Sequence, residues 1–106
     1  MTPAGNVKLV WFVPREALDP TREAVFAAGA GRIGDYEHCS WYTDGTGTFL
    51  GGEGTEPAVG LPGHEERVLE LRVETIVPRD RVQAVVEALR AAHPYEEVAF
   101  DLYPLL

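Results

Sequence analysis

The 106-residue chain has one cysteine, one serine and no long apolar run. Because Cys39 has no second cysteine to pair with, an intramolecular disulfide framework is excluded, and a reducing compartment is expected. No apolar stretch reaches the roughly 18 residues that a membrane-spanning helix needs. Residues 1–6 carry neither the basic nor the apolar region of a signal peptide. These absences predict a cytoplasmic protein that does not enter a membrane.

Positive charge is also scarce, with nine Lys and Arg residues against seventeen Asp and Glu residues and a net charge of -8. Such a chain repels a phosphate backbone and has no basic cluster to neutralise one. We therefore expect neither nucleic acid nor an anionic membrane surface as a partner. An apolar content of 45% is enough for one core at this length, so we expect a single domain over 1–106, with residues 1–6 flexible.

The residues needed for nucleophilic or acid–base catalysis are missing or badly spaced. Ser40 lies in an apolar run without the glycine-bounded turn that exposes a nucleophile. The acid pairs Glu65-Glu66 and Glu96-Glu97 are consecutive, so their side chains diverge on a strand and are expected to be solvated. We expect no enzymatic activity from this chain.

Two helices are predicted by caps and periodicity. Asp19-Pro20 supplies an N-cap and a first helical residue for a helix over 20–28, which ends at the glycines of 29–31. A second helix opens at Pro78 to Asp80, carries apolar residues at i, i+3, i+4 and i+7, and ends near His93 because Pro94 follows.

Four strands are predicted, over 7–13, 37–42, 67–77 and 97–103. With the two helices they give the order βαββαβ, which is typical of a ferredoxin-like α+β fold: an antiparallel sheet in the order 97–103, 7–13, 67–77, 37–42, with both helices on one face. The other face stays open and partly apolar, which favours a homo-oligomer. The predicted core consists of Trp11 or its neighbours, Phe26, Leu69, Leu71, Val73, Val82, Val85, Val86 and Leu89.

The segment 44–65 holds seven glycines and two prolines and is predicted to be a long loop. Asp44-Gly45 indicates a turn, after which 46–50 could run back as a small extra hairpin. Because long loops on rigid scaffolds often carry binding sites, this loop is the candidate surface for a ligand or a protein partner.

Glycines at 29, 31 and 34 satisfy the dinucleotide fingerprint GxGxxG, but they follow a helix and lead into a strand. The fingerprint holds pyrophosphate only where it follows a strand and opens a helix. The interpretation adopted is a turn.

Candidate metal ligands are His38, Cys39, His64 and His93, none with a diagnostic spacing, and a divalent ion is the candidate cofactor. His38 and Cys39 are adjacent on a predicted strand and should leave opposite faces, with Cys39 buried. His93 is expected to cap its helix by donating to the last carbonyls, the alternative being a ligand contact. Candidate ligand-binding residues are His64, His93, Tyr95 and Glu96; Glu96 is also expected to anchor the turn or a neighbouring subunit.

Residues 29–41, the turn at 45–49, residues 70–74 and the string His93-Pro94-Tyr95-Glu96-Glu97 together resemble the domain inserted in many Nif-three-like proteins. The resemblance covers Val7 to Pro104, and this chain would be that domain as a standalone protein. The inserted domain is itself similar to PII-like and CutA-like folds, and His93-Pro94-Tyr95-Glu96 also occurs in CutA proteins after the second helix.

The resemblance implies that the dinuclear metal site and any hydrolase or cyclohydrolase activity of Nif-three-like proteins belong to the two lobes that flank the inserted domain. Neither the metal site nor the activity is therefore transferred to a residue of this chain. CutA proteins are trimers linked to divalent-cation tolerance, and PII proteins are trimeric nucleotide sensors. A trimer is therefore expected, with a dimer as second choice, while the lack of a basic cluster argues against nucleotide sensing. The function implied is a non-enzymatic, oligomeric small-ligand or metal-binding regulatory module; the alternative is a metal-dependent hydrolase-related or divalent-cation tolerance protein. Whether a separate protein supplies the flanking lobes is left open.

Overall fold

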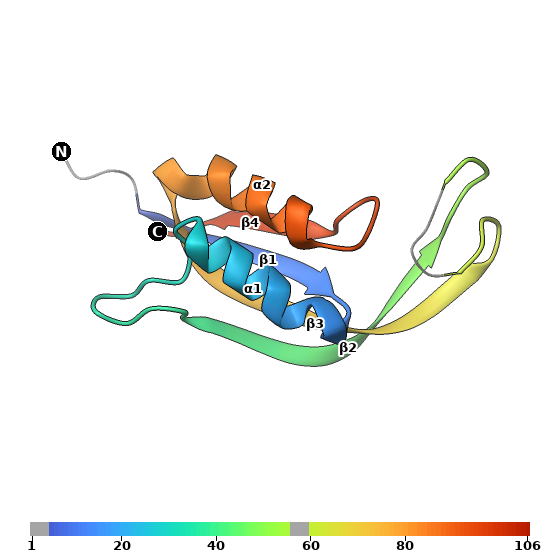
Figure 1. Cartoon of the computed structure of the whole chain (residues 1–106), viewed down its shortest axis with the longest axis horizontal. Coiled ribbons are helices and arrows are strands. Elements are labelled where there is room, and N and C mark those ends of the chain that lie inside the picture. Colours follow the sequence, from blue (N-terminus) through green and yellow to red (C-terminus); the bar gives the residue numbers. More distant parts are fainter. Residues whose placement is uncertain (1–4, 56–59) are drawn as a thin grey trace.

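The computed structural model describes residues 5–55 and 60–106 as a four-stranded antiparallel sheet in the order β2-β3-β1-β4. Helices α1 and α2 pack against each other and cover one face of the sheet (Figure 1). This arrangement confirms the predicted α+β fold and strand order. No helix among the described residues could cross a membrane. The elements are β1 (Asn6–Val13), the 3-10 turn η1 (Arg15–Ala17), α1 (Leu18–Ala27), β2 (Ser40–Leu50), β3 (Glu65–Pro78), the 3-10 turn η2 (Arg79–Arg81), α2 (Val82–Ala92) and β4 (Phe100–Pro104).

The core lies between the helices and the sheet because alternate residues of β1 and β3 point to the helices. Trp11 on β1 is fully buried, and its indole N–H donates to the Thr21 hydroxyl of α1 at 3.0 Å. That hydroxyl in turn donates to the Ala17 carbonyl at 2.8 Å. The pair joins β1 to α1 without an unsatisfied polar atom. The cluster consists of Leu9, Trp11, Val13, Ala17, Leu18, Val25, Phe26, Ala30, Leu71, Val73, Val77, Val85 and Leu89.

Most of the predicted core is confirmed, and Leu69 is the exception. Leu69 shares the alternation of Leu71 and Val73, yet it is 84% exposed. β3 extends beyond the helices at this end, so no helix covers that part of its face (Figure 1). Val82 packs partly buried against the core, and Val86 is half-buried.

The prediction for β2 was wrong at both ends. Instead of ending at Tyr42, the strand runs from Ser40 to Leu50 and pairs with β3 over its whole length, from Ser40↔Thr75 to Leu50↔Glu65. The Asp44-Gly45 pair therefore makes no turn, and the extra hairpin over 46–50 does not exist. The predicted 44–65 loop shrinks to the connection 51–64, of which 56–59 lie outside the described residues, as do 1–4 of the predicted flexible end.

The outer half of the β2–β3 hairpin, residues 46–50 and 65–70, is called the arm. It extends beyond the helices and gives the molecule its elongated dimensions of 51 × 23 × 23 Å (Figure 1). Facing it is the connection 93–99 between α2 and β4. Residues 97–99, predicted to be strand, belong to this connection, because β4 begins at Phe100. The arm and the connection lie on either side of a concavity.

The glycines of 29–34 form a turn after α1, as the sequence indicated. Gly31 is buried with φ +84°, donates its N–H to the Ile76 carbonyl at 2.8 Å, and would place a Cβ 2.6 Å from the Phe26 ring. A side chain there is excluded by both backbone conformation and space. His38, predicted on a strand, instead has φ 57° and stacks its ring on Phe26 at 4.8 Å.

Candidate functional site: the arm cleft

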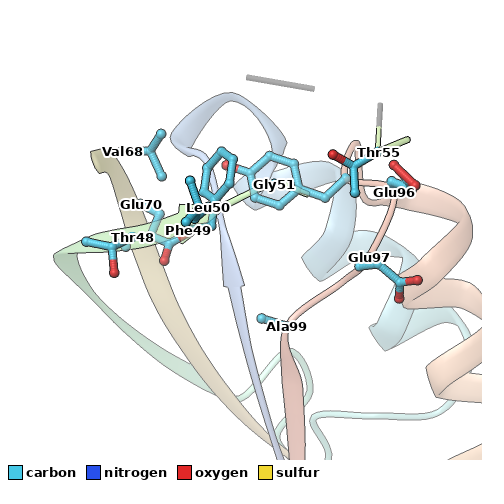
Figure 2. Close-up of a pocket in the computed structure, with 12 residues that line it drawn as sticks. Thr48, Phe49, Leu50, Gly51, Thr55, Val68, Glu70, Glu96, Glu97 and Ala99 are labelled. Atoms are coloured by element: carbon cyan, nitrogen blue, oxygen red, sulfur yellow. The ribbon is translucent and has the colours of Figure 1, made fainter. Parts of the chain in front are cut away.

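A cleft of about 350 Å³ opens between the arm and the α2–β4 connection (Figure 2). We call it the arm cleft. Its two walls come from distant parts of the sequence, which the antiparallel sheet brings together. The arm wall consists of Gly47, Thr48, Phe49, Leu50, Gly51, Thr55, Val68 and Glu70, and the facing wall of Tyr95, Glu96, Glu97 and Ala99.

On the arm wall, Glu70 lies over Gly47. Gly47 pairs with Val68 and Gly45 with Glu70, so these residues share one face of the hairpin. A Cβ on Gly47 would lie 2.0 Å from Glu70 Oε1, which shows that the carboxylate occupies the space a side chain would need. Glycine inside a strand commonly marks such a close approach. Partial burial raises the pKa of Glu70.

The facing wall is held by His93, which is buried behind it. The Tyr95 backbone N–H donates to His93 Nδ1 at 3.1 Å, so Nδ1 carries the lone pair. Nε2 then carries the proton and donates to the Phe12 carbonyl of β1 at 2.6 Å. The assigned tautomer is the neutral imidazole, and burial lowers the pKa of His93.

This geometry corrects the predicted role of His93. The end of α2 is closed by the backbone N–H of His93, which donates to the Leu89 carbonyl at 3.0 Å. The ring, expected to donate to the last helical carbonyls, reaches β1 instead. The Phe12 N–H donates to the Ala99 carbonyl at 3.2 Å. The Phe12 carbonyl accepts from the His93 ring, so the ring supplies the hydrogen bond that a further residue of β4 would otherwise make.

Tyr95 lies between His93 and the cleft. Its ring meets the His93 ring edge-on at 4.9 Å between centroids. Burial first, and then the negative charges of Glu70 and Glu16, raise the pKa of Tyr95, so the phenol is neutral at pH 7. The interaction with Glu70 couples the two walls of the cleft electrostatically. Glu96 also lines the cleft, as the sequence-based prediction of a ligand-binding role for Tyr95 and Glu96 requires.

The four candidate metal ligands come from three separate places in the fold: His38 and Cys39 just before β2, His64 just before β3, and His93 at the end of α2. His38 stacks on Phe26, and Cys39 is half-buried rather than buried, with its Sγ 3.9 Å from the Glu37 carbonyl. His64 is exposed on the connection before β3, and His93 is enclosed behind Tyr95. Across residues 5–55 and 60–106, no group of three or more His, Cys, Asp or Glu side chains could hold a metal ion. A metal role for these residues stays a prediction.

Comparison with known proteins starts from sequence. No protein-family model matches the chain. A Mycobacterium bovis protein described as a GTP cyclohydrolase 1 type 2 homolog is 54% identical over 99 residues, which cover 93% of this chain and 26% of that protein. The corresponding Bacillus subtilis homolog is 44% identical over 98 residues, with 92% and 26% covered. The chain thus spans about a quarter of the length of the curated relatives it matches.

Solved structures agree with this relationship. A Bacillus cereus protein related to NIF3 superposes with a TM-score of 0.86 at 45% identity, covering 99% of this chain and 27% of that one. The Archaeoglobus fulgidus divalent cation tolerance protein CutA (TM-score 0.69, 13% identity, 94% and 83% covered) and B. subtilis GlnK (0.62, 14%, 95% and 85%) share the fold. In sequence and in fold, this chain belongs to the NIF3 family, as a CutA-like and PII-like domain matching about a quarter of its relatives' length.

Proposed function

We propose that this domain is an oligomeric regulatory module that binds a small ligand in the arm cleft and performs no catalysis itself. The observation that supports the proposal most strongly is the cleft: apolar walls with a few convergent polar groups, one of them a carboxyl with a raised pKa. Such a combination is the usual form of a small-molecule site. The relatives' name refers to a GTP cyclohydrolase, and we assign ligand binding rather than that chemistry to the quarter represented here.

The alternative, a metal-dependent or cation-tolerance protein, has less support. It would need His38, Cys39, His64 or His93 to ligate, and among the described residues no three such side chains come together. Metal analysis of protein purified without an affinity tag tests it directly. A stoichiometric transition metal would favour the alternative over our proposal.

Filling the cleft tests the binding proposal. Ala99 is exposed on the facing wall, so Ala99→Trp should place an indole in the cleft without disturbing the core. We expect benzyl alcohol, titrated into the ¹⁵N-labelled chain, to shift the amides of Gly47, Phe49 and Tyr95 in the parent and to lose at least tenfold in affinity in the variant. Ala27→Trp, which adds the same volume to the exposed end of α1, is the matched control and should bind as the parent does.

Two outcomes of this titration contradict the proposal. One is a set of shifted amides away from both cleft walls. The other is binding that Ala99→Trp and Ala27→Trp affect equally, since the indole would then act through something other than occupying the cleft.

Homo-oligomer formation, with a trimer favoured and a dimer second, is part of the same proposal. β2 forms one edge of the sheet, and its outer side pairs with no strand among the described residues. An exposed strand edge of eleven residues offers unpaired backbone N–H and C=O groups to which another chain can add a strand. On the sheet face opposite the helices, Trp41 is 58% exposed and Tyr103 45% exposed. An edge and aromatic side chains of this kind are commonly covered in symmetric assemblies.

Light scattering coupled to size-exclusion chromatography is expected to give three times the chain mass of 11.6 kDa at micromolar concentration. Trp41→Glu should shift the mass toward the monomer, because a carboxylate buried at an interface without a partner is strongly unfavourable. Tyr36→Glu, at an aromatic residue on the 32–37 turn that is 77% exposed, is the control and should leave the mass unchanged. A monomeric parent refutes the oligomer.

A further inference from the structure

The charges of the arm cleft all have one sign. Among the described residues, three carboxylates line it, Glu70 on the arm wall and Glu96 and Glu97 on the facing wall, and the twelve described lining residues include no Lys or Arg (Figure 2). The chain as a whole carries a net charge of -8, which extends the negative field around the opening. A ligand with a phosphate or carboxylate would meet only repulsion here.

Glu70 is the carboxylate in the least solvated position. It is half-buried, and among the described residues its carboxylate has no hydrogen-bond or ion-pair partner. Arg72, two residues farther along the same face of β3, pairs instead with Glu74 at 3.1 Å. The raised pKa of Glu70 reflects this desolvation without a compensating charge. A cation bound in the cleft would supply the positive charge that Glu70 lacks.

Aromatic rings stand on both walls beside this carboxylate. Phe49 belongs to the arm wall and Tyr95 to the facing wall, and Tyr95 is close enough to Glu70 for its pKa to respond. Ring faces attract organic cations, more strongly where water is partly excluded. Apart from the hydroxyls of Thr48 and Thr55, the remaining lining is apolar or small, formed by Gly47, Leu50, Gly51, Val68 and Ala99.

We infer that the arm cleft binds a small organic cation, a protonated amine attached to an apolar or aromatic body, with Glu70 as its counter-charge and Phe49 and Tyr95 around the body. The inference rests on the proposed function, because it names the ligand class of the same site. A divalent metal ion fits less well, since hard ions require several converging oxygens and the walls between Glu70 and the facing carboxylates are apolar. A nucleotide fits less well because its phosphates would find no cation.

Three probes of nearly equal size and different charge test the inference: benzylammonium, benzyl alcohol and benzoate. Each is titrated into the ¹⁵N-labelled 106-residue chain at pH 7.5 and 0.15 M NaCl, where long-range attraction is screened. We expect benzylammonium to shift the amides of Gly47, Phe49 and Tyr95 with a dissociation constant at least tenfold lower than that of benzyl alcohol. Benzoate should produce no shift in the cleft.

Glu70→Gln keeps the shape of the side chain and removes its charge. In this variant the affinities for benzylammonium and benzyl alcohol should become equal within about threefold, with benzyl alcohol binding as in the parent. Glu23→Gln is the matched control: Glu23 is exposed on α1 and does not line the cleft, and its substitution changes the net charge by the same amount. It should preserve the tenfold preference.

The outcomes separate this inference from the proposed function. If all three probes bind the cleft equally, or benzoate binds best, the cation inference is wrong while a ligand site remains. If Glu70→Gln and Glu23→Gln weaken benzylammonium equally, the attraction is to net charge alone and the inference is again wrong. If no probe shifts any cleft amide, both the inference and the proposed binding site fail.

Discussion

Trp11→Ala is expected to destabilise the fold by about 3–5 kcal/mol, the usual cost of truncating a large buried aromatic side chain. Trp11 is fully buried at the centre of the cluster between β1 and the helices. The change also removes the indole N–H that the Thr21 hydroxyl accepts, so β1 loses its polar link to α1. Since domains of this size are stable by about 5–15 kcal/mol in total, a substantial unfolded population is expected at 37 °C.

Urea unfolding followed by far-UV circular dichroism measures the loss, with Tyr36→Ala as the control. Tyr36 is 77% exposed on the 32–37 turn, so its truncation should change the free energy of unfolding by about 0.5 kcal/mol or less. Equal midpoints for the two alanine variants would mean that the core is not organised around Trp11.

The fold was largely predictable because its signals are local and periodic. Alternation in 67–77 and the apolar run 7–13 identify the two central strands, and the i, i+3, i+4, i+7 pattern identifies α2. Alternation, however, specifies which face a residue occupies and not whether a helix covers that face. Leu69 was therefore placed in the core, although it lies on the arm beyond the helices.

The error in β2 has a different cause. Asp44-Gly45 is a strong local turn signal, but pairing with β3 over eleven residues outweighs it. β3 is fourteen residues long, and its outer half needs a hydrogen-bonding partner that only a longer β2 can supply. The local sequence does not contain that requirement, because it arises between strands far apart in the chain.

The residues of the cleft were predictable in part. Tyr95 and Glu96 attracted attention because they follow the helix-ending Pro94 in a distinctive string; both line the cleft, and their ligand-binding role stays a prediction. On the arm wall, residues 47–55 lie in the segment 44–65 predicted to meet a ligand, whereas Glu70 was missed, since recognising it as a cleft residue requires knowing that β2 continues past Gly47. One signal was available: a glycine in a strand beside an acidic residue of its partner marks a close approach.

His93→Ala is the other substitution expected to lower the stability of the fold strongly. Substitution by alanine removes the donor to the Phe12 carbonyl and the acceptor for the Tyr95 N–H, leaving two backbone groups unpaired in a buried region. Each buried unpaired group costs about 1–3 kcal/mol, so a loss of about 3 kcal/mol is expected. His64→Ala, at an exposed ring on the connection before β3, is the control and should leave the melting temperature unchanged.

The same measurement distinguishes support of the fold from direct ligand contact. If His93 only touched a ligand, His93→Ala would leave the melting temperature of the ligand-free protein unchanged and abolish only ligand-induced stabilisation. We expect instead that His93→Ala lowers the melting temperature of the ligand-free protein by a large amount. An unchanged ligand-free melting temperature would therefore overturn the structural role assigned to the ring.

The lowered pKa of His93 adds a dependence on pH whose sign is fixed. Above the ordinary value of 6.5, the ring is neutral in both folded and unfolded chains, and its stabilisation is fully present. As the pH falls below 6.5, the unfolded chain takes up a proton that the folded chain resists, because burial of the ring disfavours its charged form and lowers the pKa of His93. The free energy of unfolding therefore falls with falling pH until the pH is below the pKa of His93 in the folded chain.

His93→Gln cannot titrate at this position, so the parent and this variant should converge as the pH is lowered. Urea unfolding of both chains at pH 8.0, 6.5 and 5.0 measures the difference in free energy of unfolding, which should be largest at pH 8.0 and smallest at pH 5.0. Other titrating groups are common to both chains and cancel in this difference. A gap that stays constant or widens toward pH 5.0 would show that the neutral imidazole is not what joins α2, β1 and the Tyr95 wall of the cleft.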